Sequence, residues 1–217
     1  MMHAYDEDYL YYAQKILGDA FDFAINTVKI SPQEFEDRFT GCAVSKEFAA
    51  GNVRYIVGMN GCELAEEVLR STGYTDPLPD HVMYTDKSPE FWSGWILAFY
   101  QWYRGFSFKM ILSSLNFKDI LFMYPTFHEM DVMHFVEAAD EKLKSDHGET
   151  RLAFFRKNRG YSQSELAKKS GISIRQIQLF EQRNRDINKT SATTLFRLSR
   201  ALGCDMSDLM EPDFSSA

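Results

Sequence analysis

The sequence predicts an all-α protein with a larger helical N-terminal domain and a smaller helical C-terminal domain. Apolar residues recur at helical spacing, and no long stretch alternates between apolar and polar residues as a half-exposed strand would. Helix-start signals, in which a Ser or Asn precedes a proline or a glutamate, divide the chain into helix-sized segments. Apolar residues make up 45% of the 217 residues and aromatic residues 15%, which excludes general disorder.

Residues 5–28 are predicted to form one long helix or two. Ser31-Pro32 and Ser88-Pro89 are typical helix starts, and the proline-rich segment 72–88 between them is expected to be a surface loop. The N-terminal helices predicted after residue 28 cover 33–39, a short helix capped by Ser45 and ending at Ala50, 62–70 capped by Asn60, 91–103, 107–115, 117–123 ending before Pro125, and a last helix from Thr126 or His128 to about Ser145.

Two capping boxes stand eleven residues apart in the C-terminal part. Ser162 with Glu165 and Ser173 with Gln176 each combine a serine cap with a side chain able to reach back to the serine amide. Between them, Gly171 can adopt the positive φ of a tight turn. This order predicts a helix-turn-helix, whose second helix would enter the DNA major groove.

The net charge of −7 is unevenly distributed. Residues 1–149 contain 12 Lys and Arg against 24 Asp and Glu, whereas residues 150–217 contain 12 against 7, a formal charge of +5. A basic module favours phosphate contacts, and the acidic module would serve a different partner. The polar run 145–149 is the predicted boundary, which gives an acidic domain at 1–145, a linker at 146–149, a DNA-binding domain at 150–211 and a tail at 212–217.

Residues 150–210 resemble the Xre class of repressors, to which the lambda repressor and Cro belong. The resemblance rests on Gly160-Tyr161-Ser162-Gln163, Leu166-Ala167, Gly171-Ile172-Ser173, Ile177, Phe180-Glu181, Leu195, Leu198, Ala201-Leu202-Gly203 and Leu209. It implies a five-helix lambda-repressor-like domain that binds double-stranded DNA and acts as a transcriptional regulator, with repression as the expected activity. It also implies that Arg156 pairs with Glu181 as an architectural contact. Because one such module reaches only a few base pairs, a homodimer is expected.

The resemblance places one side of the second helix of the motif against base edges. The residues it implies there are Ile174, Arg175, Gln176, Gln178 and Leu179. Arg175 suits guanine and Gln178 suits adenine, while Leu179 either meets thymine methyl groups or completes the core. The residues expected to touch the DNA backbone are Ser162, Gln163, Arg183, Asn184, Arg185, Lys189 and Thr190. Arg183 stands where the family usually has glycine, and Asn184 can supply the left-handed residue instead.

Candidate enzyme and metal sites have simpler explanations. His128 and His134 are six residues apart, so they do not share a helix face as metal ligands would. No phosphate-binding loop or nucleophile elbow is present, so we expect no enzymatic activity, no cofactor and no metal. Three cysteines without CxxC spacing predict reduced thiols and a cytoplasmic protein. The most apolar helix, 91–103, is too short to cross a membrane.

Residues 1–145 resemble a domain found beside Xre modules in gut Firmicutes, often in toxin–antitoxin-like gene pairs. The resemblance rests on Glu47-Phe48-x-x-Gly51-Asn52, Val57-Gly58-Met59-x-Gly61-Cys62-Glu63-Leu64-Ala65 and Ser88-Pro89-Glu90-Phe91-Trp92-x-Gly94-Trp95. The favoured hypothesis is an antitoxin-like repressor whose N-terminal domain binds a toxin or another protein. The alternatives are a transcription factor with a small-molecule pocket among the aromatic residues of 91–103, and an enzyme anchored to DNA.

Overall fold

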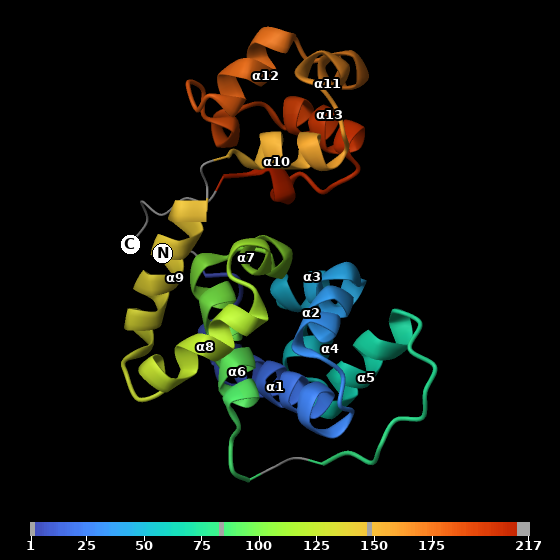
Figure 1. The fold of residues 1–217 in the computed structure, drawn as a ribbon, viewed down its shortest axis with the longest axis vertical. Coiled ribbons are helices and arrows are strands. Elements are labelled where there is room, and N and C mark those ends of the chain that lie inside the picture. The colour runs from blue at the N-terminus through green and yellow to red at the C-terminus, as the bar shows by residue number, and fades with distance from the viewer. Residues whose placement is uncertain (1–2, 83–84, 147–148, 212–217) are drawn as a thin grey trace. The chain divides into compact units, whose positions relative to one another are not determined.

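The computed structural model describes residues 3–82, 85–146 and 149–211 (Figure 1). The chain divides into two compact units, Met1–Lys142 and Leu143–Ala217, here called the N-terminal and C-terminal units. All regular elements in the described ranges are helical, which confirms the predicted all-α class. Residues 147 and 148 of the predicted linker 146–149, and the predicted tail 212–217, lie outside the described residues. No helix in the described ranges is long and apolar enough to cross a bilayer.

The N-terminal unit is a succession of mostly short helices. They are η1 (Glu7–Tyr9), α1 (Leu10–Asp22), the π-helical turn η2 (Phe23–Thr27), α2 (Pro32–Gly41), α3 (Ala43–Ala49), α4 (Val53–Ile56), α5 (Gly61–Ser71), α6 (Pro89–Arg104), α7 (Phe108–Ser114), α8 (Phe117–Phe127) and α9 (Val132–Asp146), whose last residues pass the division between the units.

Helices α1 and α6 form the centre of this unit, because glycines let their backbones approach closely. A Cβ built on Gly94 would lie 2.6 Å from the carbonyl oxygen of Leu17, and one on Gly18 would lie 2.8 Å from that of Phe91. Gly61, the first residue of α5, makes a similar close contact with α1. Aromatic side chains fill the surrounding core. The Phe21 ring, for example, stacks on another buried ring at a centroid distance of 4.0 Å.

Buried polar side chains attach α6 to its neighbours. Asp140 of α9 accepts a hydrogen bond from the Tyr100 hydroxyl at 2.7 Å and one from Arg104 Nε at 3.1 Å. Burial of Tyr100 and its hydrogen bond to Asp140 raise the pKa of its hydroxyl far above the usual value, so Tyr100 stays a donor. At the other end of α6, the hydroxyl of Ser88 caps the helix and donates to Asp22 of α1.

Several predicted helix starts and ends in this unit are confirmed. Asn60 caps α5 through a complete capping box with Glu63. Gly73 has a φ of +82° just beyond α5, and Gly105 ends α6 with a φ of +65°.

Three predicted boundaries in this unit are wrong: the start of α3, the end of α8 and the start of α9. Ser45 is not a cap, because α3 begins at Ala43 and the Ser45 hydroxyl donates to the Cys42 carbonyl inside the helix. Helix α8 continues through Pro125. Pro125 removes one amide donor and crowds the preceding turn, but the chain still closes the next turn through a 3.0 Å bond from the His128 amide to the Tyr124 carbonyl.

The last N-terminal helix starts neither at Thr126 nor at His128. Thr126 lies in α8 and His128 follows its end. The side chain of Asp131 accepts from the Met133 amide at 2.8 Å, which places the helix start at Val132.

The C-terminal unit packs short helices around a mostly aliphatic core. Its elements are α10 (Arg151–Asn158), α11 (Gln163–Ser170), α12 (Ile174–Glu181), the 3₁₀ turn η3 (Ile187–Lys189), α13 (Ala192–Leu202) and the 3₁₀ turn η4 (Ser207–Leu209). The last helix of the expected five is therefore a single 3₁₀ turn, which still carries the buried Leu209 into the core.

Candidate nucleic-acid interface

The first helix of the predicted motif, α11, begins with the expected capping box. The Ser162 hydroxyl accepts from the Glu165 amide at 3.2 Å, and the Ser162 amide donates to the Glu165 carboxylate at 2.7 Å. The second of these bonds is the main cause of the lowered pKa of Glu165. Ser162 was predicted to contact the DNA backbone. Its hydroxyl already serves as the cap, and the residue is exposed.

The second predicted capping box is only half formed. The Ser173 hydroxyl caps α12 by accepting from the Gln176 amide at 3.3 Å. However, the Gln176 side-chain oxygen accepts from that hydroxyl at 3.1 Å, and so does not reach the serine amide. The Gln176 amide oxygen therefore satisfies the Ser173 hydroxyl proton and not the Ser173 backbone amide.

The turn between the two helices depends on a glycine. Gly171 ends α11 with a φ of +68°, as predicted. No atom lies within 4 Å of a Cβ built there, so the backbone conformation, and not crowding, requires glycine. The turn then places Ile172 in the core, 7% exposed.

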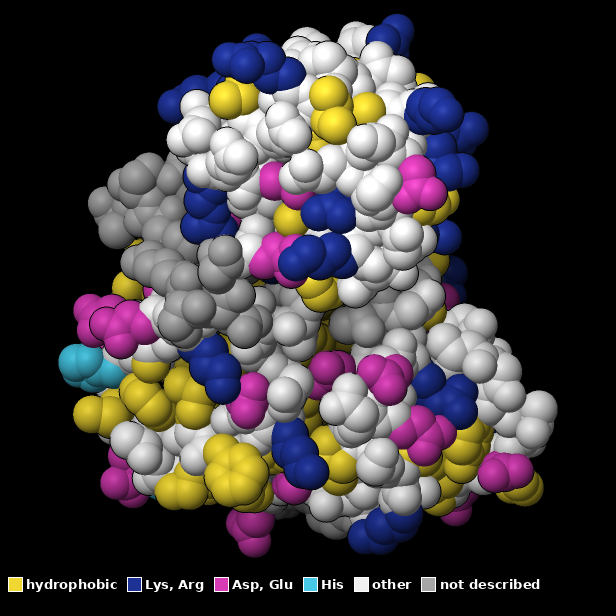
Figure 2. All heavy atoms as spheres, turned by 45° about the horizontal axis from the view of Figure 1, so that its top comes forward, with side chains coloured by type: hydrophobic (Ala, Val, Ile, Leu, Met, Phe, Trp, Pro, Cys, Tyr) yellow, Lys and Arg dark blue, Asp and Glu magenta, His cyan; other side chains and the backbone are white. Residues whose placement is uncertain are grey.

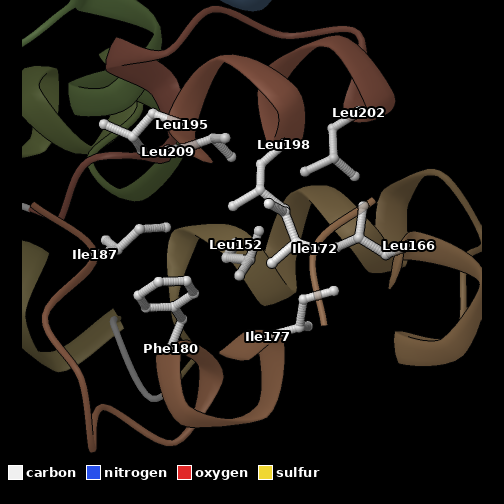
Figure 3. Packing of buried hydrophobic residues seen from close by; sticks show 10 residues of the cluster. All are labelled: Leu152, Leu166, Ile172, Ile177, Phe180, Ile187, Leu195, Leu198, Leu202 and Leu209. Atoms are coloured by element: carbon white, nitrogen blue, oxygen red, sulfur yellow. The ribbon is translucent and has the colours of Figure 1, made fainter. Parts of the chain in front are cut away.

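Helix α12 is held from behind by two buried residues. Ile177 is fully buried and Phe180 is 3% exposed, and both point from α12 into the core (Figure 3). The ten members of this cluster are Leu152, Leu166, Ile172, Ile177, Phe180, Ile187, Leu195, Leu198, Leu202 and Leu209. Because two successive turns of α12 are anchored, the helix has a fixed orientation about its axis.

The opposite side of α12 faces outward. Ile174 is 41% exposed and Arg175 is exposed, while Gln176 and Gln178 are half-buried. Leu179 is half-buried and is not a member of the core cluster. An exposed branched apolar residue beside an arginine is the mixture expected of a surface that meets thymine methyl groups and guanine edges.

Arg156 and Glu181 form a two-pronged ion pair between α10 and α12. Arg156 Nε and Nη2 donate to the two Glu181 oxygens at 2.6 and 2.9 Å, and Nη1 donates to the Tyr161 carbonyl at 2.7 Å. The two side chains are 11% and 7% exposed. The bond to Glu181 raises the pKa of Arg156, so the pair remains charged.

A short series of hydrogen bonds extends from this ion pair to the outer side of α12. Gln163 Nε2 donates to Glu181 Oε2 at 2.8 Å, and Gln178 Nε2 lies 3.5 Å from Gln163 Oε1. Since a carboxylate only accepts, the Gln163 amide group must turn its nitrogen to Glu181 and its oxygen to Gln178. Gln163 was predicted to contact a phosphate. Its side chain is hydrogen-bonded within the domain, and its backbone amide lies in the first turn of α11.

The segment after α12 takes its left-handed residue one position earlier than predicted. Arg183 itself has a φ of +57°, and Asn184 is not in that region. A non-glycine residue there is strained by roughly 1–2 kcal/mol. The Arg183 Nη2 atom lies 3.5 Å from the Glu149 carbonyl oxygen and 3.8 Å from a Glu211 carboxylate oxygen. A phosphate would therefore have to compete with these contacts for Arg183.

The other predicted backbone-contacting residues surround this segment. Arg185 is exposed, and its guanidinium lies 5.7 Å from the centre of the Phe180 ring. The Lys189 side chain is 84% exposed, Asn184 is exposed and Thr190 is half-buried. On the face drawn in Figure 2, Lys and Arg side chains are prominent on the C-terminal unit.

One contact that supports this segment was missed by the sequence analysis. The side chain of Asn188 exchanges two hydrogen bonds with the Glu211 backbone, at 2.8 and 2.9 Å, and a Glu211 oxygen accepts from the Arg151 amide at 2.7 Å. Partners 23 and 60 residues apart leave no local pattern that could have indicated this contact.

Comparison with known proteins identifies this part of the chain. Residues 152–209 match a family model described as helix-turn-helix (HTH_3). No curated protein and no solved structure matches the chain. The C-terminal unit therefore contains a helix-turn-helix domain, and such a domain implies DNA binding. Among the described residues, no group of three or more metal-ligating side chains is found.

Proposed function

We propose that the protein is a sequence-specific transcriptional repressor that reads DNA with α12. The observation that carries this proposal is the division of α12 into a buried and an exposed side. Ile177 and Phe180 hold the helix from behind, while Arg175 stands exposed on the other side. Base contacts are assigned to Ile174, Arg175, Gln176, Gln178 and Leu179, with Arg175 on guanine and Gln178 on adenine.

Phosphate contacts fix where the domain sits along the duplex. They are assigned to Ser162, Gln163, Arg183, Asn184, Arg185, Lys189 and Thr190. Within 151–200 there are 12 basic and 3 acidic residues, which supports attraction to the backbone in the presence of an acidic N-terminal unit.

A single domain of this size reaches only a few base pairs, so the functional form is a homodimer on a palindrome. Its half-sites would be centred about 34 Å apart, or one helical turn of DNA. Selection of bound duplexes from a random pool by the full chain tests this proposal. Enrichment of a two-fold symmetric sequence supports it, and recovery of unenriched DNA even at low salt contradicts it.

The N-terminal unit is proposed to bind a partner protein, in the manner of an antitoxin that represses its own operon from the cytoplasm. The excess of acidic residues in 1–149 favours a basic partner surface. Co-purification of the full chain with the product of the adjacent gene would test this role. A stable complex at equal stoichiometry supports it, and separate elution contradicts it.

Ligand sensing by the N-terminal unit is a second candidate, and a specific observation favours it. The unit contains a cavity of about 330 Å³ beside Trp95, within the usual size range of small-molecule sites.

A further inference from the structure

The cavity in the N-terminal unit has aromatic walls. It lies among α6, the end of α8 and the start of α9, and its walls include Phe91, Trp92, Trp95, Tyr124 and Phe127. All five side chains are half-buried, so each offers part of its surface to the cavity although the same unit buries many other rings completely. Flat walls of this kind favour a flat, largely apolar molecule.

The aromatic walls are held in place by contacts with neighbouring rings. The Trp92 ring meets the buried Phe135 ring edge-on, with centroids 5.8 Å apart, and also contacts Tyr124 at 5.5 Å. The His128 ring stacks on Tyr124 at 4.4 Å. Because neighbouring rings support these side chains, a ligand would meet a preformed surface and would lose less affinity to side-chain ordering.

The polar groups around the cavity are mainly hydrogen-bond donors. Among the described lining residues, Lys87 is the one Lys or Arg, and none is Asp or Glu. Lys87 Nζ donates to Asp19 at 2.9 Å and lies 4.1 Å from the centre of the Phe91 ring. An ammonium group has three hydrogens, so Asp19 leaves two for another acceptor. The indole N–H groups of Trp92 and Trp95 can also only donate.

Among the described lining residues, His128 is the one whose ring nitrogen can accept a hydrogen bond from a ligand. Its Nδ1 lies 2.8 Å from the Tyr124 carbonyl oxygen, which can only accept, so Nδ1 carries the proton. The neutral ring therefore presents Nε2 as an acceptor, and the protonated ring presents it as a donor. The Glu129 carboxylate is 3.7 Å from Nε2 and is highly exposed, at 86%.

From these groups we infer that the cavity binds a small aromatic carboxylate. The ring system lies between the indole and phenyl walls, and the carboxylate accepts from Lys87. An aromatic cage by itself would favour a quaternary ammonium, but the described lining contributes the Lys87 ammonium and no carboxylate. This inference rests on the ligand-sensing role proposed for this cavity and does not depend on the DNA-binding role, since it concerns only side chains of the N-terminal unit.

Calorimetric titration of the full chain with three probes that share a naphthalene ring tests the inference. The probes are 2-naphthoate, 2-naphthol and 2-naphthylmethylammonium, which differ in charge. We expect naphthoate to bind about tenfold or more tighter than naphthol, as a charge-assisted hydrogen bond would give, and the ammonium to bind weakest. Absence of heat with all three, or equal or tighter binding of naphthol or the ammonium, overturns the inference.

Variants locate the binding site. Lys87→Gln keeps a donor for Asp19 and should abolish the preference for naphthoate over naphthol, while Lys87→Arg should retain it. Val132→Trp should weaken all probes, because Val132 lines the cavity at the start of α9. Lys142→Gln is the matched control, since Lys142 pairs with Asp119 at 3.2 Å and does not line the cavity.

Melting curves confirm that each variant is folded before its titration is interpreted. Naphthoate binding that survives both Lys87→Gln and Val132→Trp unchanged places the site elsewhere and overturns the inference.

Discussion

The two units build their helical cores from different kinds of side chain. The largest fully buried side chains all belong to the N-terminal unit and are mostly phenylalanines, together with Tyr100. The core cluster of the C-terminal unit contains one aromatic residue, Phe180, among leucines and isoleucines. The N-terminal unit therefore depends on the fit of large rings, whereas the C-terminal unit depends on aliphatic contacts. Each unit also contains a buried ion pair, Arg104–Asp140 in the first and Arg156–Glu181 in the second.

The candidate functional surfaces of the two units also differ. In the C-terminal unit the candidate site is an exposed helix side whose orientation is set by the residues behind it. In the N-terminal unit the candidate site is a hollow between helices, and the wall residues are themselves part of the packing. We therefore expect surface substitutions in the C-terminal unit to change DNA binding without changing stability. Substitutions in the cavity walls of the N-terminal unit should change stability and ligand binding together.

The largest expected effect comes from breaking the buried ion pair of the C-terminal unit, Arg156–Glu181. Glu181→Ala should destabilise the C-terminal unit by about 3–5 kcal/mol, because it leaves the Arg156 charge buried without its partner. All three tryptophans lie in the N-terminal unit, so tryptophan fluorescence follows that unit and circular dichroism follows both. We expect a new early transition by circular dichroism and an unchanged fluorescence midpoint in urea.

The exposed pair of Lys189 and Asp186 provides the control for this change. Lys189→Ala should change stability by less than about 1 kcal/mol, because the side chains are 84% and 42% exposed. If the fluorescence midpoint of Glu181→Ala fell as far as its circular-dichroism midpoint, the two units would not unfold independently.

Gly94→Ala should have the opposite selectivity. The added methyl group would lie 2.6 Å from the Leu17 carbonyl oxygen, so α1 and α6 must separate, at about 1–3 kcal/mol. The fluorescence midpoint in urea should fall, and operator affinity should remain. Gly41→Ala is the matched control, since no atom lies within 4 Å of its Cβ position. Equal destabilisation by both variants would exclude close helix contact as the cause.

Arg175→Ala tests the surface of the C-terminal unit without touching its core. We expect a loss of about 1–3 kcal/mol in operator binding and a relaxed preference at one base pair. Arg185→Ala should instead weaken all sequences alike and reduce the salt slope by about one. Binding curves of the selected operator and of single-base variants at several salt concentrations distinguish the two. Unchanged affinity and selectivity in Arg175→Ala would show that α12 is not the recognition helix.

The smallest effect is expected at the strained turn after α12. Arg183→Gly should stabilise the C-terminal unit by up to about 1 kcal/mol, because glycine tolerates the φ of +57°. The loss of the Arg183 contacts to Glu149 and Glu211 offsets part of that gain. Asn184→Gly should give no gain in the same urea titration. If Asn184→Gly raised stability and Arg183→Gly lowered it, Asn184 and not Arg183 would be the left-handed residue.

Local patterns in the sequence were sufficient for most helices and for the outline of the motif. Asn60, Ser162 and Gly171 act within a turn of their own positions, so their roles could be predicted. Prediction failed where a competing local contact was equally plausible. Gln176 accepts from the Ser173 hydroxyl instead of reaching its amide, and the Asp131 cap moved the start of α9.

What the sequence alone determined is the all-α class, the helix-turn-helix and the unequal distribution of charge, because each follows from spacing and composition along the chain. The tertiary structure decided which glycines admit close helix contact, how Gln163 is oriented, that Arg183 adopts the left-handed conformation, and where aromatic rings line a cavity. Those features depend on residues distant in the chain, whose mutual distances are set only when the core packs.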